Sequence, residues 1–174
     1  SNFQEQIHEL YHDLITFGTG VMFIEQDPDV GMRFSTRHIS ECFLSEDDKG
    51  RVDTVFRKFK MPGRAVLMRF GEEKLDSKML KQIETNPYDM VELIHAVFKR
   101  SERDVTKVNA QNKPFASVYL DPRTKTVLSE SGFDEFPYVA PRFLKASFEV
   151  GYGRSPAMTA LPDIKMLNKM SEVT

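Results

Sequence analysis

The pattern His-Glu-x-x-His at residues 8–12 has the spacing most typical of catalysis in this chain. On a helix, His8 and His12 lie one turn apart and could bind one zinc ion, with Glu9 polarising a bound water. This gives a first hypothesis for function, a zinc-dependent peptidase. The competing interpretation is a chance match, because the apolar side chains of this segment define a helix face from which both histidines point away.

The surrounding residues do not extend the zinc motif. Ile15 stands where the longer form of the motif needs glycine, and Gly18 stands where it needs a third histidine. The other two histidines, His38 and His95, fall on predicted strands. A third ligand would therefore have to be a more distant glutamate.

Other catalytic arrangements have less support in the sequence. Gly18-Thr19-Gly20 lacks the further glycine and the strand-before-helix order of a dinucleotide site. Cys42 is the single cysteine, which excludes an internal disulfide, and no nucleophile signature surrounds it. Adjacent carboxylates fall in contexts typical of turns or helix starts, at Asp47–Asp48, Glu72–Glu73 and Asp134–Glu135.

A second hypothesis, a nucleic-acid-binding module, rests on the basic run Arg57-Lys58-Phe59-Lys60. On a strand, alternation places Arg57 with Phe59 on one face and Lys58 with Lys60 on the other. Lysines also commonly protect the edges of sheets. No sequence-reading module accompanies the run, and acidic residues are interleaved in the other basic cluster, at residues 99–107.

Composition narrows the class of protein. The chain has 174 residues, of which 40% are hydrophobic and 29% charged, with a net charge of −2. Such a chain can bury a core and is neither disordered nor fibrous. Its longest apolar run, residues 21–24, is too short to span a bilayer, so we expect no membrane association.

Hydrophobic periodicity predicts an α+β fold, with an N-terminal amphipathic helix, antiparallel hairpins and short helices. Helices are expected at residues 3–17, where Gly18 ends the helix, from Pro62 to Phe70, and at 75–84. Strands are expected at residues 21–25, 32–34, 38–44 with 51–61, 88–99, 114–120 with 124–130, and 136–148. The segment 88–99 also fits a helical period, and residues 100–114 are predicted to form an exposed loop.

The end of the chain predicts a helix start. Two glycines flank Tyr152, Ser155 suits the N-cap position, and Pro156 suits the first helical position. Pro162 is expected to kink or restart the helix. The stripe Ala160, Ile164, Leu167 and Met170 then belongs to a truncated helix with no obvious covering partner, which suggests a neighbouring subunit or further chain. The alternative is a terminal helix that docks back onto its own domain.

Three segments in this part of the chain form a recognisable set. They are Phe136-Pro137-Tyr138-Val139-Ala140-Pro141-Arg142-Phe143, Tyr152-Gly153-Arg154-Ser155-Pro156 and Ala160-Leu161-Pro162-Asp163-Ile164-Lys165-Met166-Leu167-Asn168. Together they resemble the portal (head-to-tail connector) proteins of short-tailed bacteriophages. The resemblance assigns a structural role to Tyr152, Gly153, Arg154, Ser155, Pro156, Leu161, Pro162, Asp163 and Asn168.

This resemblance implies a virion structural protein and not an enzyme, without catalytic, cofactor-binding or metal-binding residues. Such proteins form a ring, usually of twelve subunits, at one capsid vertex. Double-stranded DNA passes through the ring during packaging and ejection, and the ring meets the capsid, the terminase and the tail proteins. Assembly takes place in the cytoplasm of the bacterial host.

The resemblance also suggests a division of this chain. Residues 1–150 are similar to the wing, an α+β domain, and residues 151–174 to the Gly/Pro turn and the start of the stem helix. The rest of the stem, the channel and the clip are expected beyond Thr174.

Overall fold

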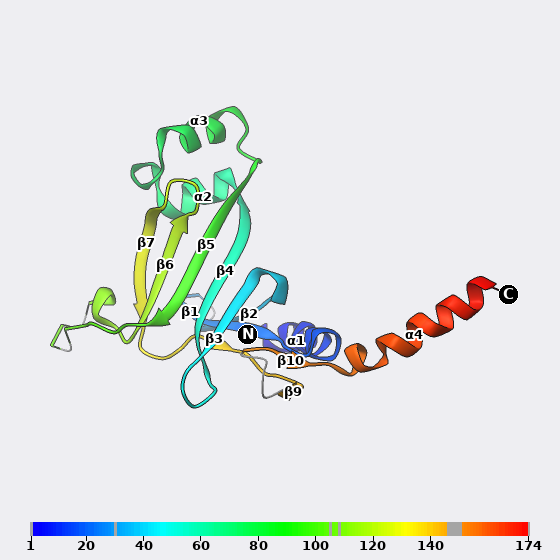
Figure 1. Ribbon diagram of the computed structural model, residues 1–174. Coiled ribbons are helices and arrows are strands. Elements are labelled where there is room, and N and C mark those ends of the chain that lie inside the picture. The colour runs from blue at the N-terminus through cyan, green and yellow to red at the C-terminus, as the bar shows by residue number, and fades with distance from the viewer. Residues whose placement is uncertain (1, 30, 105, 108, 146–150, 174) are drawn as a thin grey trace. The chain divides into compact units, whose positions relative to one another are not determined.

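The computed structural model describes residues 2–29, 31–104, 106–107, 109–145 and 151–173. The described residues contain both α-helices and antiparallel sheets, so the predicted α+β class is confirmed (Figure 1). The chain divides into two compact units. The first combines residues 1–52 with 137–174, and the second comprises residues 53–136.

The first unit begins with helix α1 (Phe3–Phe17), which has the predicted bounds. Gly18 ends it in a left-handed conformation with φ of 76°, and the Gly18 N–H donates to the Leu14 carbonyl oxygen at 3.0 Å. Glycine suits this position because a side chain there would crowd the following backbone. The local sequence was therefore sufficient to place this helix end.

A three-stranded antiparallel sheet in the order β2-β1-β8 lies beside α1. Its strands are β1 (Val21–Asp27), β2 (Gly31–Arg37) and β8 (Tyr138–Val139). The central strand β1 is buried over its first three residues, in agreement with its apolar sequence. Pro137 and Pro141 flank β8 at the edge of this sheet, a position that suits proline because it has no backbone N–H to donate to a neighbouring strand.

Residues at the start of α1 form hydrogen bonds with the other edge strand, β2. The side-chain amide of Asn2 donates to the Phe34 carbonyl oxygen at 2.8 Å and accepts from the Phe34 N–H at 3.1 Å. One helical turn later, the Gln6 carbonyl accepts from the Thr36 hydroxyl at 2.7 Å. These contacts fix α1 along β2 and protect an edge that would otherwise be open to pairing.

The remaining elements of the first unit are short, apart from the terminal helix. They are the 3₁₀ turn Ile39–Glu41, β3 (Cys42–Glu46), β9 (Leu144–Lys145), β10 (Gly153–Arg154) and α4 (Pro156–Val173). The extended segment predicted at 136–148 thus contains β8 and β9, and its residues 146–148 lie outside the described part of the chain. The first arm of the hairpin predicted at 38–61 begins with the 3₁₀ turn, and its strand starts only at Cys42.

The second unit contains four antiparallel strands, which follow one another in the sheet: β4 (Val52–Pro62), β5 (Met90–Lys99), β6 (Phe115–Asp121) and β7 (Thr126–Phe133). The first residue of β4, Val52, is counted with the first unit. The segment 88–99 is therefore a strand, and the helical alternative is wrong. The strand pairs along both edges, with Arg57 opposite His95 and His95 opposite Tyr119. Its residues 95–97 are buried in succession, so both faces are covered there, which explains why its apolar residues are nearly continuous.

Two helices cover one end of this sheet (Figure 1). They are α2 (Gly63–Phe70) and α3 (Ser77–Thr85), with 3₁₀ turns at Glu72–Lys74 and Ala110–Asn112 in the connecting loops. Helix α3 begins two residues later than predicted because the Asp76 carboxylate accepts from the Met79 N–H at 3.1 Å and caps the helix there. The core beneath contains Phe59, Val66, Leu75, Met79, Ile83, Val91, Leu93 and Leu128.

We predict that Met79→Ala destabilises the second unit by about 2–5 kcal/mol, because it leaves a cavity in a core where Met79 is 0% exposed. Met68→Ala on α2 is the matched control, because Met68 is 87% exposed and its replacement should change stability by less than about 0.5 kcal/mol. Urea unfolding followed by circular dichroism measures both. Equal effects of the two substitutions would contradict the core assignment.

Candidate functional site

The start of α4 is fixed by the Ser155 side chain, which is 1% exposed. Its hydroxyl accepts from the Met158 N–H at 2.9 Å, which is the predicted N-cap bond, and donates to the Thr16 carbonyl oxygen at 2.8 Å. Pro156 occupies the first helical position, where its missing N–H leaves no bond unmade. One hydroxyl therefore starts α4 and ties it to the end of α1.

Gly153 lies against Gly18 with no room for a side chain. A Cβ atom on Gly153 would be 2.5 Å from the Gly18 carbonyl oxygen and 2.9 Å from the Arg142 Cβ. The Gly153 N–H donates to the hydroxyl oxygen of the buried Thr19 at 2.8 Å. Residues 153–154 also pair with β9, so this backbone is enclosed by α1's end on one side and by a strand on the other.

Tyr152 connects the same segment to β3. Its hydroxyl donates to the Cys42 carbonyl oxygen at 3.2 Å and accepts from the Leu44 N–H at 3.3 Å. These two backbone groups point to the same side of a strand, because residues i and i+2 share an edge. The phenol therefore takes the place that a pairing residue of another strand would occupy.

An ion-pair network supports the strand that pairs with β10. The guanidinium of Arg142 contacts the Glu46 carboxylate and donates to the Gly50 carbonyl oxygen at 3.0 Å. Lys145 reaches the same carboxylate at 3.4 Å. The Glu46 side chain is 9% exposed, so its charge is balanced by two cations in a largely desolvated setting.

The remaining residues of the predicted motif lie farther along α4 and are not brought to this junction. Leu161, Pro162, Asp163 and Asn168 are all exposed. Of the kink or restart predicted at Pro162, the restart does not occur, since residues 156–173 form a single helix. Arg154, between Gly153 and Ser155, is also exposed.

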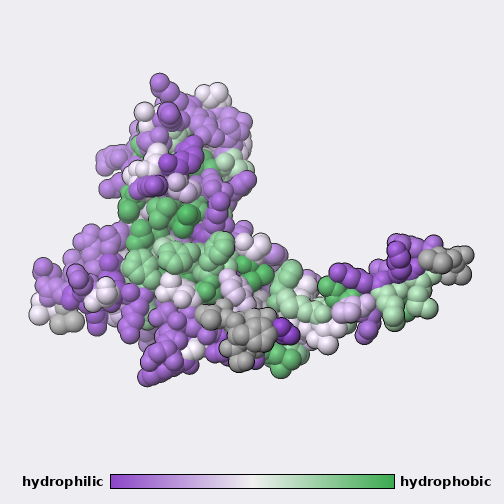
Figure 2. Space-filling view, viewed as in Figure 1, coloured by the Kyte–Doolittle hydropathy of each residue, from purple (hydrophilic) through white to green (hydrophobic). Residues whose placement is uncertain are grey.

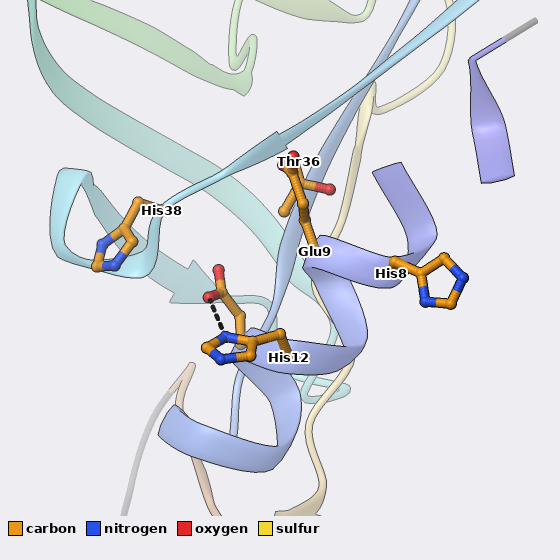
Figure 3. Close-up of a pocket in the computed structure, with 6 residues that line it drawn as sticks. His8, Glu9, His12, Thr36 and His38 are labelled. Atoms are coloured by element: carbon orange, nitrogen blue, oxygen red, sulfur yellow. Dashed lines mark ion pairs between the residues drawn. The ribbon is translucent and has the colours of Figure 1, made fainter. Parts of the chain in front are cut away.

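The histidines of the His-Glu-x-x-His pattern do not converge on a common point. Both are exposed on α1, and Figure 3 shows the His8 ring directed away from the His12 ring. Within the described residues, no three side chains of His, Cys, Asp or Glu are placed to hold a metal ion. The zinc-peptidase hypothesis therefore finds no support.

The basic run 57–60 makes local contacts within its own sheet. The Arg57 guanidinium lies 4.2 Å from the centre of the Phe59 ring, on the predicted shared face, and the Lys58 ammonium pairs with Glu92 at 3.1 Å. Two of the three basic side chains thus have partners within the unit. The nucleic-acid-binding hypothesis finds no support either.

Several residues of the junction had no signal in the sequence. Thr16, Thr19, Cys42 and Leu44 contribute through contacts that span more than 100 positions along the chain. Gly18 was predicted as a helix end, but nothing local indicated that Gly153 would pack on it. A covariation signal between these positions is the kind of evidence that would have found them.

Asp13 is another residue that the sequence did not single out. It is 8% exposed on α1, and burial raises the pKa of its carboxyl, an effect that the nearby His38 and His12 partly offset. The His12 Nδ1 atom lies 4.0 Å from the carboxylate (Figure 3).

Within the described residues, no helix is long and apolar enough to cross a membrane.

Comparison with known proteins identifies relatives along the whole chain. Residues 1–174 match the family described as bacteriophage head to tail connecting protein. The chain is 34% identical over 170 residues to the portal protein of Salmonella phage epsilon15, covering 96% of this chain and 31% of that protein. It is 31% identical over 171 residues to the probable portal protein of Bordetella phage BPP-1, covering 96% and 30%. The chain thus spans about three-tenths of the length of these relatives.

We predict that Tyr152→Phe destabilises the first unit by about 1–2 kcal/mol, because it removes one hydroxyl and leaves two backbone groups of β3 without that partner. Amide hydrogen exchange at Leu44 should accelerate in the same variant. Tyr88→Phe is the control, since Tyr88 is exposed and no hydrogen bond of its hydroxyl is found in the described structure. Unchanged exchange at Leu44 would show that the phenol does not hold β3.

Asp13→Asn is expected to stabilise the protein at pH 7, because the ionised carboxylate is held in a desolvated position. The folded-state pKa is raised, so the stabilisation that protonated Asp13 contributes in acid is lost as pH rises through that pKa. The advantage of the variant should therefore shrink as pH falls toward the ordinary value of 3.8. Urea unfolding across pH, with exposed Asp29→Asn as control, measures this; an advantage that grows in acid would contradict it.

Proposed function

The chain belongs to the bacteriophage head to tail connecting protein family, and from this we propose that it is part of a portal ring that joins phage head to tail. The ring, of twelve subunits in our proposal, lies at one capsid vertex of the virion and lets double-stranded DNA pass. Its partners are further copies of the chain, the capsid, the terminase and the tail proteins. Its subunits assemble in the host cytoplasm, and its role is structural and not enzymatic.

The observation that carries this proposal is the exposed apolar surface of α4. Large apolar side chains are exposed along the whole helix (Figure 2), at Met158, Leu161, Ile164, Met166, Leu167 and Met170. At 100° per residue they are distributed around the helix and not along one stripe. A helix that is apolar on several sides needs covering on more than one of them, and a ring supplies each subunit with two neighbours.

The junction described above fits this role. Ser155, Gly153 and Tyr152 fasten the start of α4 to α1 and β3 by hydrogen bonds and close backbone packing. An anchored start fixes the direction of the first turn, so the apolar surface is presented in a defined orientation. We accordingly propose that residues 1–150 form the wing-like domain and residues 151–174 the turn and the beginning of the stem-like helix.

The test is ring formation by the full-length protein. We expect the double variant Ile164→Asp with Leu167→Asp to reduce rings by at least about tenfold, because two buried charges would face a neighbouring subunit. Met68→Asp, an exposed apolar position on α2, should leave ring formation intact. Electron microscopy and mass photometry count the rings.

Circular dichroism shows whether the double variant still folds, as its exposed positions lead us to expect. Rings that form normally in the double variant would overturn the assignment of α4 to the subunit interface. A full-length protein that stays monomeric at assembly concentrations would overturn the ring itself.

A further inference from the structure

A hollow of about 510 Å³ lies between α1 and the end of β2 with the residue that follows it (Figure 3). We call it the α1 hollow; its lining residues are His8, Glu9, His12, Asp13, Thr36 and His38. Its volume is within the range of sites that bind small ligands or single side chains. The junction and α4 do not use it.

The charge of the α1 hollow is unbalanced. Glu9 and Asp13 are one helical turn apart on α1 and both line it, whereas no lysine or arginine does so among the described residues. The Asp13 side chain is 11% exposed, and the ion pair found for it among the described residues is with His12, whose Nδ1 atom lies 4.0 Å away.

A largely buried carboxylate whose charged neighbour is an imidazole 4.0 Å away is costly, and a ligand that supplies a close charged donor would lower that cost. Burial raises the pKa of Asp13, as expected for a carboxylate whose charged form is poorly solvated. The position therefore favours a cationic ligand over a neutral or anionic one.

The lining disfavours a metal ion as that cation. No group of three ligating side chains is found among the described residues, and Figure 3 shows the His8 ring directed away from the others. The Thr36 hydroxyl already donates to the Gln6 carbonyl oxygen, and His38 Nδ1 accepts from the Ser40 N–H at 3.2 Å. A guanidinium, by contrast, needs only a carboxylate and a flat surface to stack on.

We propose that the α1 hollow binds an arginine side chain from a partner protein, with the guanidinium donating to the Asp13 carboxylate. Glu9 adds negative charge beside it, and the imidazole ring of His12 offers a planar surface for stacking. This site is separate from the α4 surface and does not depend on ring formation.

Isothermal titration calorimetry on the full-length protein tests the proposal, with N-acetyl-arginine amide as the probe. N-acetyl-citrulline amide is the matched neutral probe, since it keeps the shape of arginine without its charge. We expect saturable binding of the arginine amide with a dissociation constant on the order of millimolar, as suits a ligand of this size, and at least about tenfold weaker binding of the citrulline amide.

Two variants locate the site. Asp13→Asn should weaken arginine-amide binding by at least about tenfold, whereas Glu5→Gln, an exposed carboxylate of α1 outside the hollow, should change it by less than about twofold. Because Asp13→Asn is expected to be stable, lost binding cannot be ascribed to unfolding, and the urea curve checks this directly. No saturable binding, equal binding of both probes, or an unchanged affinity in Asp13→Asn would each overturn the proposal.

Discussion

The close approach of two glycines is the constraint on which the rest of the first unit depends. Gly18 ends α1 in a left-handed conformation, and the backbone of Gly153 lies against its carbonyl group at a distance that no side chain tolerates. Because the two backbones meet, Thr19 can reach the Gly153 N–H and Ser155 can reach the Thr16 carbonyl. A wider spacing would break both bonds together, and with them the fixed start of α4.

Local patterns were sufficient to predict most of the elements. Helix α1 and its glycine end, the hairpin of β6 with β7, and the Ser155–Pro156 helix start all follow from residues within a few positions of one another. Even so, periodicity left β5 between strand and helix, because a strand that is buried on both faces, as at residues 95–97, loses the alternation that normally identifies it. The capping carboxylate of Asp76 moved the start of α3 in a way that apolar spacing does not reveal.

The candidate site was predictable only in part. The segment around Tyr152 was identified from its own residues, but its partners Thr19 and Cys42 lie 134 and 110 positions away along the chain. The reverse holds for the histidine pattern, where correct spacing on a helix was present but the side chains diverge. Burial of Asp13 on an amphipathic helix had no signal, because a single polar residue on the covered side is invisible to periodicity.

The first unit is built from two separated stretches, whereas the second is continuous and its strands are neighbours in both sequence and sheet. Contacts between near positions form at low entropic cost, so the continuous unit can fold as soon as residues 53–136 have been synthesised. The first unit must wait for residues 137–156, which supply β8, the strand that pairs with β10, and the junction itself. The direction of α4 thus depends on contacts between residues more than 100 positions apart in the sequence, whereas neighbouring strands close the second unit.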